Sequence, residues 1–459
     1  MSLTPLDDTI AAIATPLGEG GLAVVRISGD AALQVADKTF LPVGKNSRKP
    51  SEADSHTIHY GKVMRAGRQV DEVLCAVMRA PRTFTRQDVV EISCHGGILS
   101  TKSVLDAILE NGARLAEPGE FTKRAFLNGR IDLTQAEAIA DLIHSRTELA
   151  LTAANEQLAG KLSQRINQLR DDLMTTLAHI EAYIDFPEEH LEEETREQLL
   201  QRLENGVKFM DELLLTANEG QILRRGVRAV IVGRPNAGKS SLLNQLLGRD
   251  RAIVSHIPGT TRDTIEETAN IRGIPVVLID TAGLREARDE IESEGIRRSH
   301  ESLATAEVIL HVLDASEALT AEDEKFLADF ASKKRILVRN KMDLPAKLEL
   351  PAQDSPTVSV CSLTGKGLEE LKDAIKSLVW SGQINNEMLQ VMINSRHQDA
   401  LKRTRASTIL ALDALRADVF LDLVAVDLFV AVRAVGEIVG KTATEDLLDK
   451  IFSQFCIGK

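Results

Sequence analysis

The chain has 459 residues, 43% of them hydrophobic and 27% charged, which is enough for two or three soluble domains that each bury a core. A net charge of −13 and an aromatic content of 3% argue against a generally basic RNA-binding protein and against a sheet that stacks bases. The most apolar late stretch, 420–432, is broken by Asp422 and Asp427 and followed by Arg433, so no membrane span is expected.

The N-terminal sequence predicts a cytoplasmic protein. The first basic residue is Arg26, so no charged segment precedes an apolar signal core. The cysteines lack the close spacing of a zinc site, which favours a reducing compartment. They are Cys75, Cys94, Cys361 and Cys456.

Residues 1 to about 120 read as an α+β unit. Short strands are expected at 21–28, 59–65, 71–78 and 88–94, with a helix following at 95–110. From about 122 the pattern becomes helical, and apolar residues at steps of three and four between 162 and 184 predict one long amphipathic helix.

A second helix is expected at 199–214, after Pro187. Residues 225–380 then alternate buried-type strands with helical stretches, which is typical of a mostly parallel sheet covered by helices. Beyond Trp380 the sequence is again helix-forming until Phe455. We therefore predict one helical bundle that is interrupted by an inserted α/β unit.

Two basic segments, 223–228 (LRRGVR) and 396–405 (RHQDALKRTR), are candidates for RNA contact in this acidic chain. Either one, taken alone, is more typical of a solvated helix face.

The stretch 233–240 (GRPNAGKS) fits the pattern G-x-x-x-x-G-K-[ST] between a predicted strand and a predicted helix. Gly233 and Gly238 would let backbone N–H groups converge on phosphates. Lys239 would reach the β and γ oxygens, and Ser240 would bind Mg²⁺. The sequence therefore predicts a nucleotide site.

Two further motifs specify the nucleotide. Asp280 begins 280–283 (DTAG) at the end of a strand, where it would hold Mg²⁺ through water and Gly283 would sense the γ-phosphate. Asp343 ends 340–343 (NKMD), and its carboxylate can accept hydrogen bonds from N1–H and the 2-amino group of guanine. With 259–264 (GTTRDT), the four elements predict a GTPase.

The water-orienting glutamine of small signalling GTPases is replaced by Leu284, so hydrolysis must depend on another group. Glu286, Glu290 and Glu292 lie just downstream, and each alone is more typical of a solvated charge.

The chain resembles the bacterial and organellar tRNA-modification GTPases of the MnmE/TrmE family over essentially its whole length. The resemblance rests on the motifs at 14–29, 117–143, 233–244, 257–264, 280–286 and 451–459. It implies four segments: 1–120 as a folate-binding and dimerisation domain, 121–220 and 380–459 as two parts of a helical domain, and 221–379 as a Ras-like P-loop GTPase domain.

The resemblance also implies a homodimer that assembles with an FAD- and NADH-dependent subunit of the MnmG/GidA type into a heterotetramer. That assembly would add a carboxymethylaminomethyl or aminomethyl group at C5 of wobble uridine 34 of certain tRNAs. Its one-carbon donor would be a 5-formyl- or 5,10-methylene-tetrahydrofolate type of reduced folate. GTP hydrolysis would drive conformational steps.

Carried over residue by residue, the resemblance assigns GTP-binding roles to positions in all four motifs and in the loop at 361–363. They are Asn236, Ala237, Gly238, Lys239, Ser240, Ser241, Ser255, His256, Ile257, Pro258, Gly259, Thr260, Thr261, Asp280, Thr281, Ala282, Gly283, Asn340, Lys341, Met342, Asp343, Cys361, Ser362 and Leu363.

The resemblance also implies the cations and the catalytic group. Mg²⁺ would be bound by Ser240 and Thr261, and Glu292 would be the catalytic glutamate. A K⁺ ion beside the bridging oxygens would supply the positive charge that an arginine finger gives elsewhere. Its ligands would be Asn236, Ser255, Ile257 and Thr260.

Folate contacts are assigned by the resemblance to Arg26, Glu91, Arg130 and Lys459. A carboxylate suits the N–H donors of a pterin, and cations suit its glutamyl tail. Arg130 stands where the family commonly has lysine, which keeps the charge but changes the hydrogen-bond geometry. Cys361 stands where the guanine-backing loop usually has serine, so a side-chain hydroxyl is missing there and the loop is expected to relax without a change of base.

Cys456, the fourth residue from the end, allows several interpretations. The terminal Gly458 and Lys459 do not fit a prenylation box, and the cysteine spacing does not fit a metal or disulfide pair. Two hypotheses remain: a reactive thiol that faces the folate and is activated by Lys459, and a small buried hydrophobe beside Phe452 and Phe455. A chain end is normally frayed, and a fixed charge pair is an unusual end to a core, so the position favours the first hypothesis and Cys456 is predicted to be catalytic.

Two other classes of GTPase compete with this interpretation. A ribosome-assembly GTPase is disfavoured by the single P-loop and the absence of a GXXG module, and a membrane-remodelling GTPase by the absence of a basic amphipathic or lipid-anchoring segment.

Overall fold

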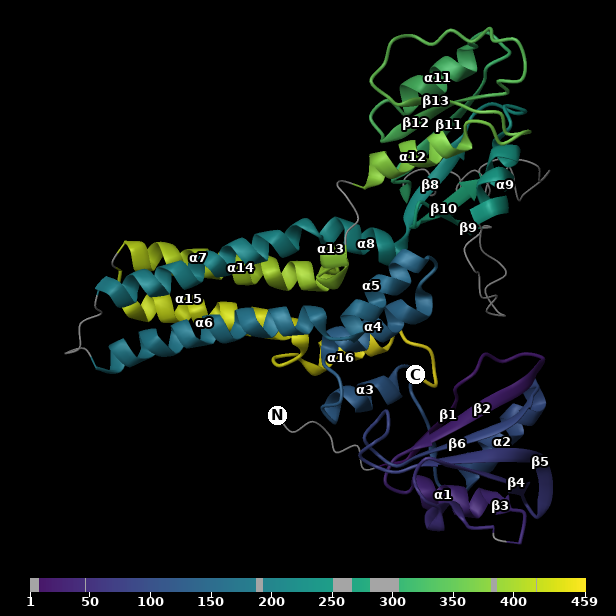
Figure 1. Ribbon diagram of the computed structural model, residues 1–459, viewed down its shortest axis with the longest axis vertical. Helices are drawn as coiled ribbons and strands as arrows, with labels where there is room; N and C mark the ends of the chain where they lie inside the picture. Colours follow the sequence, from purple (N-terminus) through teal and green to yellow (C-terminus); the bar gives the residue numbers. More distant parts are fainter. Residues whose placement is uncertain are drawn as a thin grey trace.

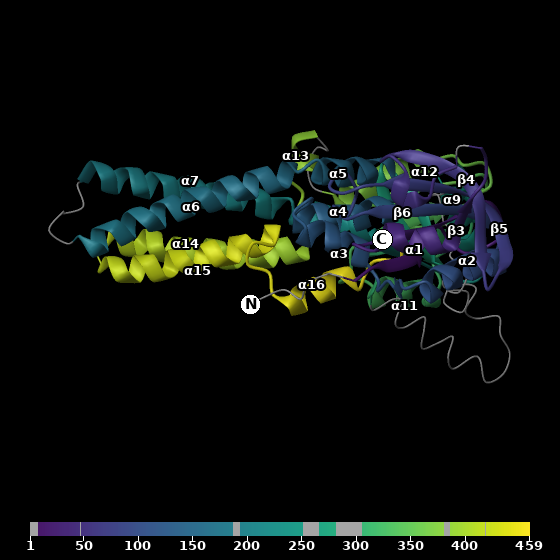
Figure 2. The same ribbon diagram turned by 90° about the horizontal axis from the view of Figure 1, so that it is seen from below.

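The computed structural model describes residues 8–45, 47–186, 193–250, 266–280, 305–380, 386–417 and 419–459. Two β-sheets and a long helical bundle make up the molecule (Figure 1). Seen from below, the bundle projects away from both sheets (Figure 2). No helix in the described segments combines the length and apolar character that crossing a membrane requires.

The N-terminal sheet has seven strands in the order β3-β4-β5-β6-β2-β1-β7, antiparallel except for the β1–β7 pair. Its strands are β1 (Ile10–Ile13), β2 (Gly20–Ser28), β3 (Phe40–Pro42), β4 (Thr57–Arg65), β5 (Arg68–Met78), β6 (Val89–Gly96) and β7 (Arg114–Leu115). Helices α1 (Ala32–Thr39) and α2 (Ile98–Glu110) contribute to its core, and a short 3₁₀ turn lies at Pro50–Glu52.

The pleat of this sheet decides which side chains are free to form a site. Val25 and Ile27 of β2 are buried in the core with Ile92 of β6. Because strand side chains alternate between the two faces, Arg26 and its cross-strand partner Glu91 lie on the opposite face. The sequence predicts β2, β4, β5 and β6 correctly but misses β1, β3 and β7, which are too short to carry a period-two signal.

The bundle pairs helices from distant parts of the sequence. The long helices α6 (Lys161–Asp185) and α7 (Glu193–Leu215) pack with α14 (Ser395–Arg416) and α15 (Leu421–Val439) around one apolar core (Figures 1 and 2). The predicted stripe between 162 and 184 faces this core. The prediction of one bundle around an inserted α/β unit is therefore confirmed.

Shorter helices connect the bundle to the two sheets. They are α3 (Glu120–Leu127), α4 (Leu133–His144), α5 (Glu148–Leu158), α8 (Ala217–Arg225), α13 (Asn386–Gln390) and α16 (Glu445–Phe452). Helix α16 packs against α3, and the C-terminus lies beside α3 (Figure 1).

The second sheet has six strands in the order β13-β12-β11-β8-β10-β9, parallel except for the antiparallel β9–β10 pair. Its strands are β8 (Val227–Val232), β9 (Glu266–Ile271), β10 (Ile274–Asp280), β11 (Val308–Asp314), β12 (Arg335–Asn340) and β13 (Thr357–Ser359). Its described helices are α9 (Lys239–Asp250), α11 (Ala321–Asp329) and α12 (Leu368–Val379).

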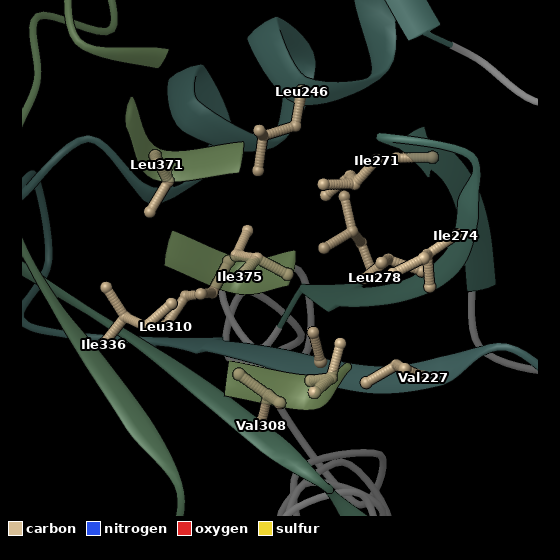
Figure 3. Packing of buried hydrophobic residues seen from close by; sticks show 14 of the residues in the cluster. Val227, Leu246, Ile271, Ile274, Leu278, Val308, Leu310, Ile336, Leu371 and Ile375 are labelled. Atoms are coloured by element: carbon tan, nitrogen blue, oxygen red, sulfur yellow. The ribbon is translucent and has the colours of Figure 1, made fainter. Parts of the chain in front are cut away.

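The core of this sheet explains the continuous apolar strands of the sequence. Figure 3 shows Leu246 of α9 and Leu371 and Ile375 of α12 packing over strand residues such as Leu278 and Leu310. Phe330 packs against a separate buried cluster formed by other residues of β8, β10 and β11. Because side chains on both faces of the strands are covered, the strands contain few polar positions.

Candidate functional site

The carboxyl ends of the parallel strands meet at one edge of the six-stranded sheet. The strand registers align Asp280 with Ile231 and Asp314 with Asn340. In open α/β sheets, ligands bind at this edge. The phosphate loop, Asp280 and the 340–343 motif therefore lie at the same edge of the sheet.

Backbone geometry makes the phosphate loop depend on its glycines. Gly233 has φ 148° and Gly238 has φ 95°, both positive values that other residues rarely adopt. A Cβ at Gly233 would lie 2.2 Å from the carbonyl oxygen of Val312, and one at Gly238 would lie 2.1 Å from Nδ2 of Asn340. The loop therefore has room for backbone alone, which is what close approach to phosphates requires.

Lys239 begins α9 and folds back over the loop. Its Nζ donates to the carbonyl oxygens of Gly233 (3.0 Å) and Arg234 (2.8 Å). The ammonium group therefore lies inside the curve of the loop, where it can pair with phosphate oxygens. Asn236 is exposed with φ 61°, Ala237 is buried, and Ser240 and Ser241 follow on the first turn of α9.

Asn340 connects three parts of the site, a role that the sequence reasoning did not assign to it. Its Nδ2 donates to the carbonyl oxygen of Ala237 (2.8 Å). Its Oδ1 accepts from the backbone N–H (3.0 Å) and the hydroxyl (2.8 Å) of Ser362. The phosphate loop and the 361–363 loop are therefore fixed to the end of β12. An amide side chain at the end of an apolar strand was the available sequence signal, since such a group needs hydrogen-bond partners when it is buried.

Cys361 donates its thiol to Oδ1 of Asp343, at 3.1 Å. Its backbone N–H also donates to the carbonyl oxygen of Lys366 (2.8 Å), and the residue is buried. The thiol thus gives the carboxylate a donor in place of the missing hydroxyl. Met342 and Leu363, the other residues here, are exposed.

Lys341 lies against the neighbouring strand end. With φ 63°, it places Nζ 2.6 Å from Oδ2 of Asp314. Burial alone would raise the pKa of Asp314, but the hydrogen bonds from Lys341 and Ser316 lower that pKa below its ordinary value. The carboxylate is therefore ionised at neutral pH and holds the lysine beside the base-recognition motif.

Several predicted residues lie outside the described residues: Ser255, His256, Ile257, Pro258, Gly259, Thr260, Thr261, Thr281, Ala282, Gly283, Leu284, Glu286, Glu290 and Glu292. Among the described residues, no cluster of histidine, cysteine, aspartate or glutamate forms a metal site.

A second group of predicted residues meets on the N-terminal sheet. Arg26 Nε donates to Glu91 Oε1 (2.7 Å), and its Nη1 donates to the carbonyl oxygen of Gly458 (3.2 Å). The guanidinium group also lies 5.6 Å from the ring centroid of Phe121. The C-terminal tail is therefore seated beside the Arg26–Glu91 pair.

The tail is held by its backbone. Gly119 N–H donates to the carbonyl of Cys456 (3.4 Å), and Phe121 N–H donates to that of Lys459 (3.2 Å). Gly458 has φ 94°, and a Cβ there would lie 2.4 Å from the carbonyl oxygen of Ile13. Only glycine fits this approach.

The environment of Cys456 tests the hypothesis that this residue is a small buried hydrophobe. Phe452 and Phe455 are buried with Leu133, whereas Cys456 is exposed. The interpretation of Cys456 as a buried hydrophobe is therefore wrong. The aromatic residues anchor the tail, and the thiol is left accessible.

Arg130 contacts an aromatic residue of the neighbouring core. Its guanidinium group lies 5.4 Å from the ring centroid of Phe84 and donates to the carbonyl oxygen of Thr83. Phe84 packs against the small core that contains Phe121. Sequence reasoning missed both rings; the sole signal for Phe121 was its place in the motif at 117–143. Lys459 is half-buried, and its carbonyl oxygen accepts from the N–H of Phe121. Arg130 at Phe84 and Arg26 at Phe121 therefore contact two rings of the same small core.

The parallel sheet, the glycine-dependent phosphate loop and the buried Asn340 define a P-loop GTPase. Residues 9–130 match the family described as "GTP-binding protein TrmE N-terminus", and residues 133–456 match the family described as "MnmE helical domain". The chain belongs to the MnmE/TrmE family of tRNA-modification GTPases, and it is a GTPase that acts in tRNA modification.

Curated relatives match over nearly the full length. The "tRNA modification GTPase MnmE" of Geobacillus kaustophilus is 49% identical over 98% of this chain and 99% of that protein. The protein of the same name from Bacillus subtilis is 46% identical over 98% and 100%. Among solved structures, the G domain of the T. maritima FeoB iron transporter is 28% identical, covers 33% of this chain and 98% of that chain, and has a TM-score of 0.24.

Proposed function

We propose that this GTPase adds a carboxymethylaminomethyl or aminomethyl group at C5 of wobble uridine 34, with a reduced folate as one-carbon donor and an FAD-dependent subunit as partner. The observation that carries the proposal is the meeting of Arg26, Glu91 and the 456–459 tail on the N-terminal sheet. An exposed thiol two residues before the carbonyl that contacts a cation–carboxylate pair is of no use to GTP hydrolysis. It suits a second reaction at a separate site.

The donor set of this second site fits a folate. Glu91 can accept from the adjacent N–H donors of a pterin, while Arg26, Arg130 and Lys459 can pair with carboxylates of the glutamyl tail. The rings of Phe84 and Phe121 supply apolar surface between these charges. When bound, the folate would supply the one-carbon unit, and these residues would orient it beside the tail.

The folate site makes a testable prediction. Arg26→Ala or Glu91→Ala should weaken binding of 5-formyltetrahydrofolate by about a hundredfold, because each leaves a partly buried charge without its partner. Isothermal titration calorimetry on the full chain measures this affinity, which we expect to be micromolar or weaker for the unchanged protein. Arg65→Ala is a matched control, since Arg65 pairs with Glu110 on the same domain, away from the tail. Unchanged affinity in both site variants would move the folate elsewhere.

In the nucleotide site, Mg²⁺ would be held by Ser240 and Thr261, and Asp280 would act through water. Asn236, with Ser255, Ile257 and Thr260, would hold K⁺, and Glu292 would position the attacking water. The exposed Asn236 side chain at positive φ on the outer surface of the phosphate loop supports the first of these K⁺ ligands.

We expect GTP hydrolysis to be at least about tenfold faster in K⁺ than in Na⁺, because a smaller ion fits loose oxygen ligands poorly and Leu284 cannot orient water. Steady-state phosphate release at matched ionic strength measures the ratio. Equal rates in the two salts would show that K⁺ takes no part in catalysis.

In the same assay, Glu292→Ala should raise the activation barrier of GTP hydrolysis by about 3–5 kcal/mol while GTP affinity is retained. Normal turnover in this variant would reject the catalytic role of Glu292.

The proposal includes a homodimer formed through the N-terminal domains. Ile58, Tyr60 and Leu74 are exposed on one face of the β4–β5 pair, where Tyr60 lies opposite Leu74, and Leu41 of β3 is exposed too. Contiguous exposed apolar residues of this kind favour a protein interface. Sedimentation that finds a monomer at micromolar concentration would contradict the dimer.

We also propose that the chain is divided into four segments, 1–120, 121–220, 221–379 and 380–459, of which the second and fourth together form the helical domain.

The function is tested by mass spectrometry of nucleosides from transfer RNA of a strain that lacks this gene. We expect unmodified uridine at the wobble position and its modified form after complementation with this chain. Modified uridine in the deletion strain would contradict the proposal. A ribosome-assembly role would instead leave wobble nucleosides unchanged and alter ribosomal subunit profiles.

A further inference from the structure

A cavity of about 410 Å³ lies where four helices meet: α4, α8, α14 and α16. Its charged lining residues are Glu137, Arg224, Arg225, Arg396 and Lys450. Neither the nucleotide site nor the tail site uses these side chains. Four cations against one carboxylate give the cavity a positive lining in a chain whose net charge is −13.

The single carboxylate in the lining is already neutralised. Arg396 donates to both oxygens of Glu137 (2.9 and 2.7 Å), and the ring of His397 lies 2.8 Å from Oε2. Burial alone would raise the pKa of Glu137, but Arg396 and His397 hold that pKa well below its ordinary value. Glu137 thus stays ionised and fixes Arg396 in the wall.

Two cations remain available to a ligand. Arg224 is paired with Asp141 (2.6 Å), which lies outside the lining. Within the described part of the chain, Arg225 and Lys450 make no ion pair, and both are exposed. They come from α8 and α16, so the fold, rather than one basic helix, brings them to the same opening.

The cavity also unites the two basic segments of the sequence. Arg224 and Arg225 belong to 223–228, and Arg396 opens 396–405. Each segment alone resembles a solvated face, but the structure places these three arginines around one hollow. Convergence of basic side chains from separate elements is the footprint of a phosphate-rich ligand.

The position of the cavity favours RNA over a small anion. Gln454 and Phe455 line it, and Cys456 is the next residue in the chain. A phosphate held by Lys450 and Arg225 would therefore lie close to the segment that carries the exposed thiol. Polar side chains at the opening, including Ser395 and Gln454, can donate to further phosphate or ribose oxygens.

We propose that this cavity binds backbone phosphates of the transfer RNA substrate and holds the RNA beside the Cys456 tail. The inference rests on the proposed function, since it takes transfer RNA as the substrate. It adds a binding surface in a protein whose overall charge repels RNA.

The test is a fluorescence-anisotropy titration of labelled, unmodified transfer RNA with the full-length protein over a series of KCl concentrations. Arg225→Glu and Lys450→Glu should each weaken binding by about tenfold, and the double variant by about a hundredfold. The slope of log K against log salt should fall by about one per lost contact. Arg225→Lys should retain most of the affinity, because it keeps the charge.

Lys325→Glu is the matched control, since it makes the same charge change on an exposed residue of α11, a helix that lies far from α4, α8 and α16 in Figure 1. Circular dichroism and thermal melting check that each variant is folded. Site variants that bind transfer RNA with the affinity and salt slope of Lys325→Glu would overturn the proposal. Variants that keep RNA affinity but lose binding of inorganic phosphate would also overturn it, in favour of a small anion. Variants that keep RNA affinity but lose binding of the FAD-dependent subunit would overturn the proposal as well, in favour of a protein contact.

The experiment separates this proposal from the function on which it rests. If the unchanged protein binds transfer RNA and the cavity variants bind it equally well, only the cavity assignment fails. If the unchanged protein does not bind transfer RNA at all, the proposed substrate fails with it.

Discussion

Replacing Cys456 with serine should abolish transfer RNA modification while leaving GTP hydrolysis and dimerisation intact. The tail is held by the carbonyls of residues 456, 458 and 459 and by the buried Phe452 and Phe455, none of which the substitution alters. The thiol is exposed, so its loss creates no cavity. A hydroxyl is a far weaker nucleophile than a thiolate at neutral pH, and the expected loss of modification is therefore complete.

The measurement is the level of modified wobble uridine in a deletion strain that expresses Cys456→Ser. Ser453→Ala is a suitable control, because it is an equally small change at an exposed position of the same tail. Wild-type modification in the Cys456→Ser strain would make the tail a purely structural element.

Asp343→Asn should change the base preference of the nucleotide site from guanine to xanthine. We expect GTP affinity to fall by roughly a thousandfold and xanthosine triphosphate to become the better substrate. The carboxylate accepts from N1–H and the 2-amino group of guanine, whereas an amide N–H can donate to the carbonyl that replaces that amino group. Competition of the two nucleotides against a fluorescent GDP analogue measures the change. A variant that still hydrolyses GTP and ignores xanthosine triphosphate would contradict this account of the base site.

Cys361→Ala provides the control for this prediction. It removes the thiol that donates to Asp343 but leaves the carboxylate in place. GTP affinity should fall by up to about tenfold, the usual cost of one lost hydrogen bond, with no change of base preference. Cys361→Ser should restore the affinity, because a hydroxyl supplies the same donor.

The nucleotide site was predictable because its geometry is imposed locally. Gly233 and Gly238 are required because a Cβ at either position would lie within 2.2 Å of another atom, the carbonyl oxygen of Val312 or Nδ2 of Asn340. The glycines of the motif and the shape of the loop therefore express the same steric constraint. The bundle helices were predictable for a similar reason, since the period of apolar residues between 162 and 184 reports which face is buried. The short β1, β3 and β7 carry too few residues for such a period.

Contacts between distant segments were not predictable from residue patterns. Arg26 and Gly458 are 432 positions apart, and nothing in either local sequence specifies the other. Only the family resemblance brought Arg26, Glu91 and Lys459 together as candidates. Neither residue patterns nor the family resemblance predicted the cavity at Arg225 and Lys450. The periodicity of one helix shows which of its faces is exposed, but it does not show which other helix the fold places next to that face.

We propose that the folate carbon reaches the wobble base from the site at the C-terminal tail of this GTPase. The most direct test supplies methylenetetrahydrofolate labelled with ¹³C at the transferred carbon to the purified chain, its FAD-dependent partner, NADH, unmodified transfer RNA and GTP. We predict that mass spectrometry will find the modified wobble uridine heavier by one mass unit, and that Cys456→Ser or a non-hydrolysable GTP analogue will prevent its formation. A modified uridine that forms without the label would contradict the account.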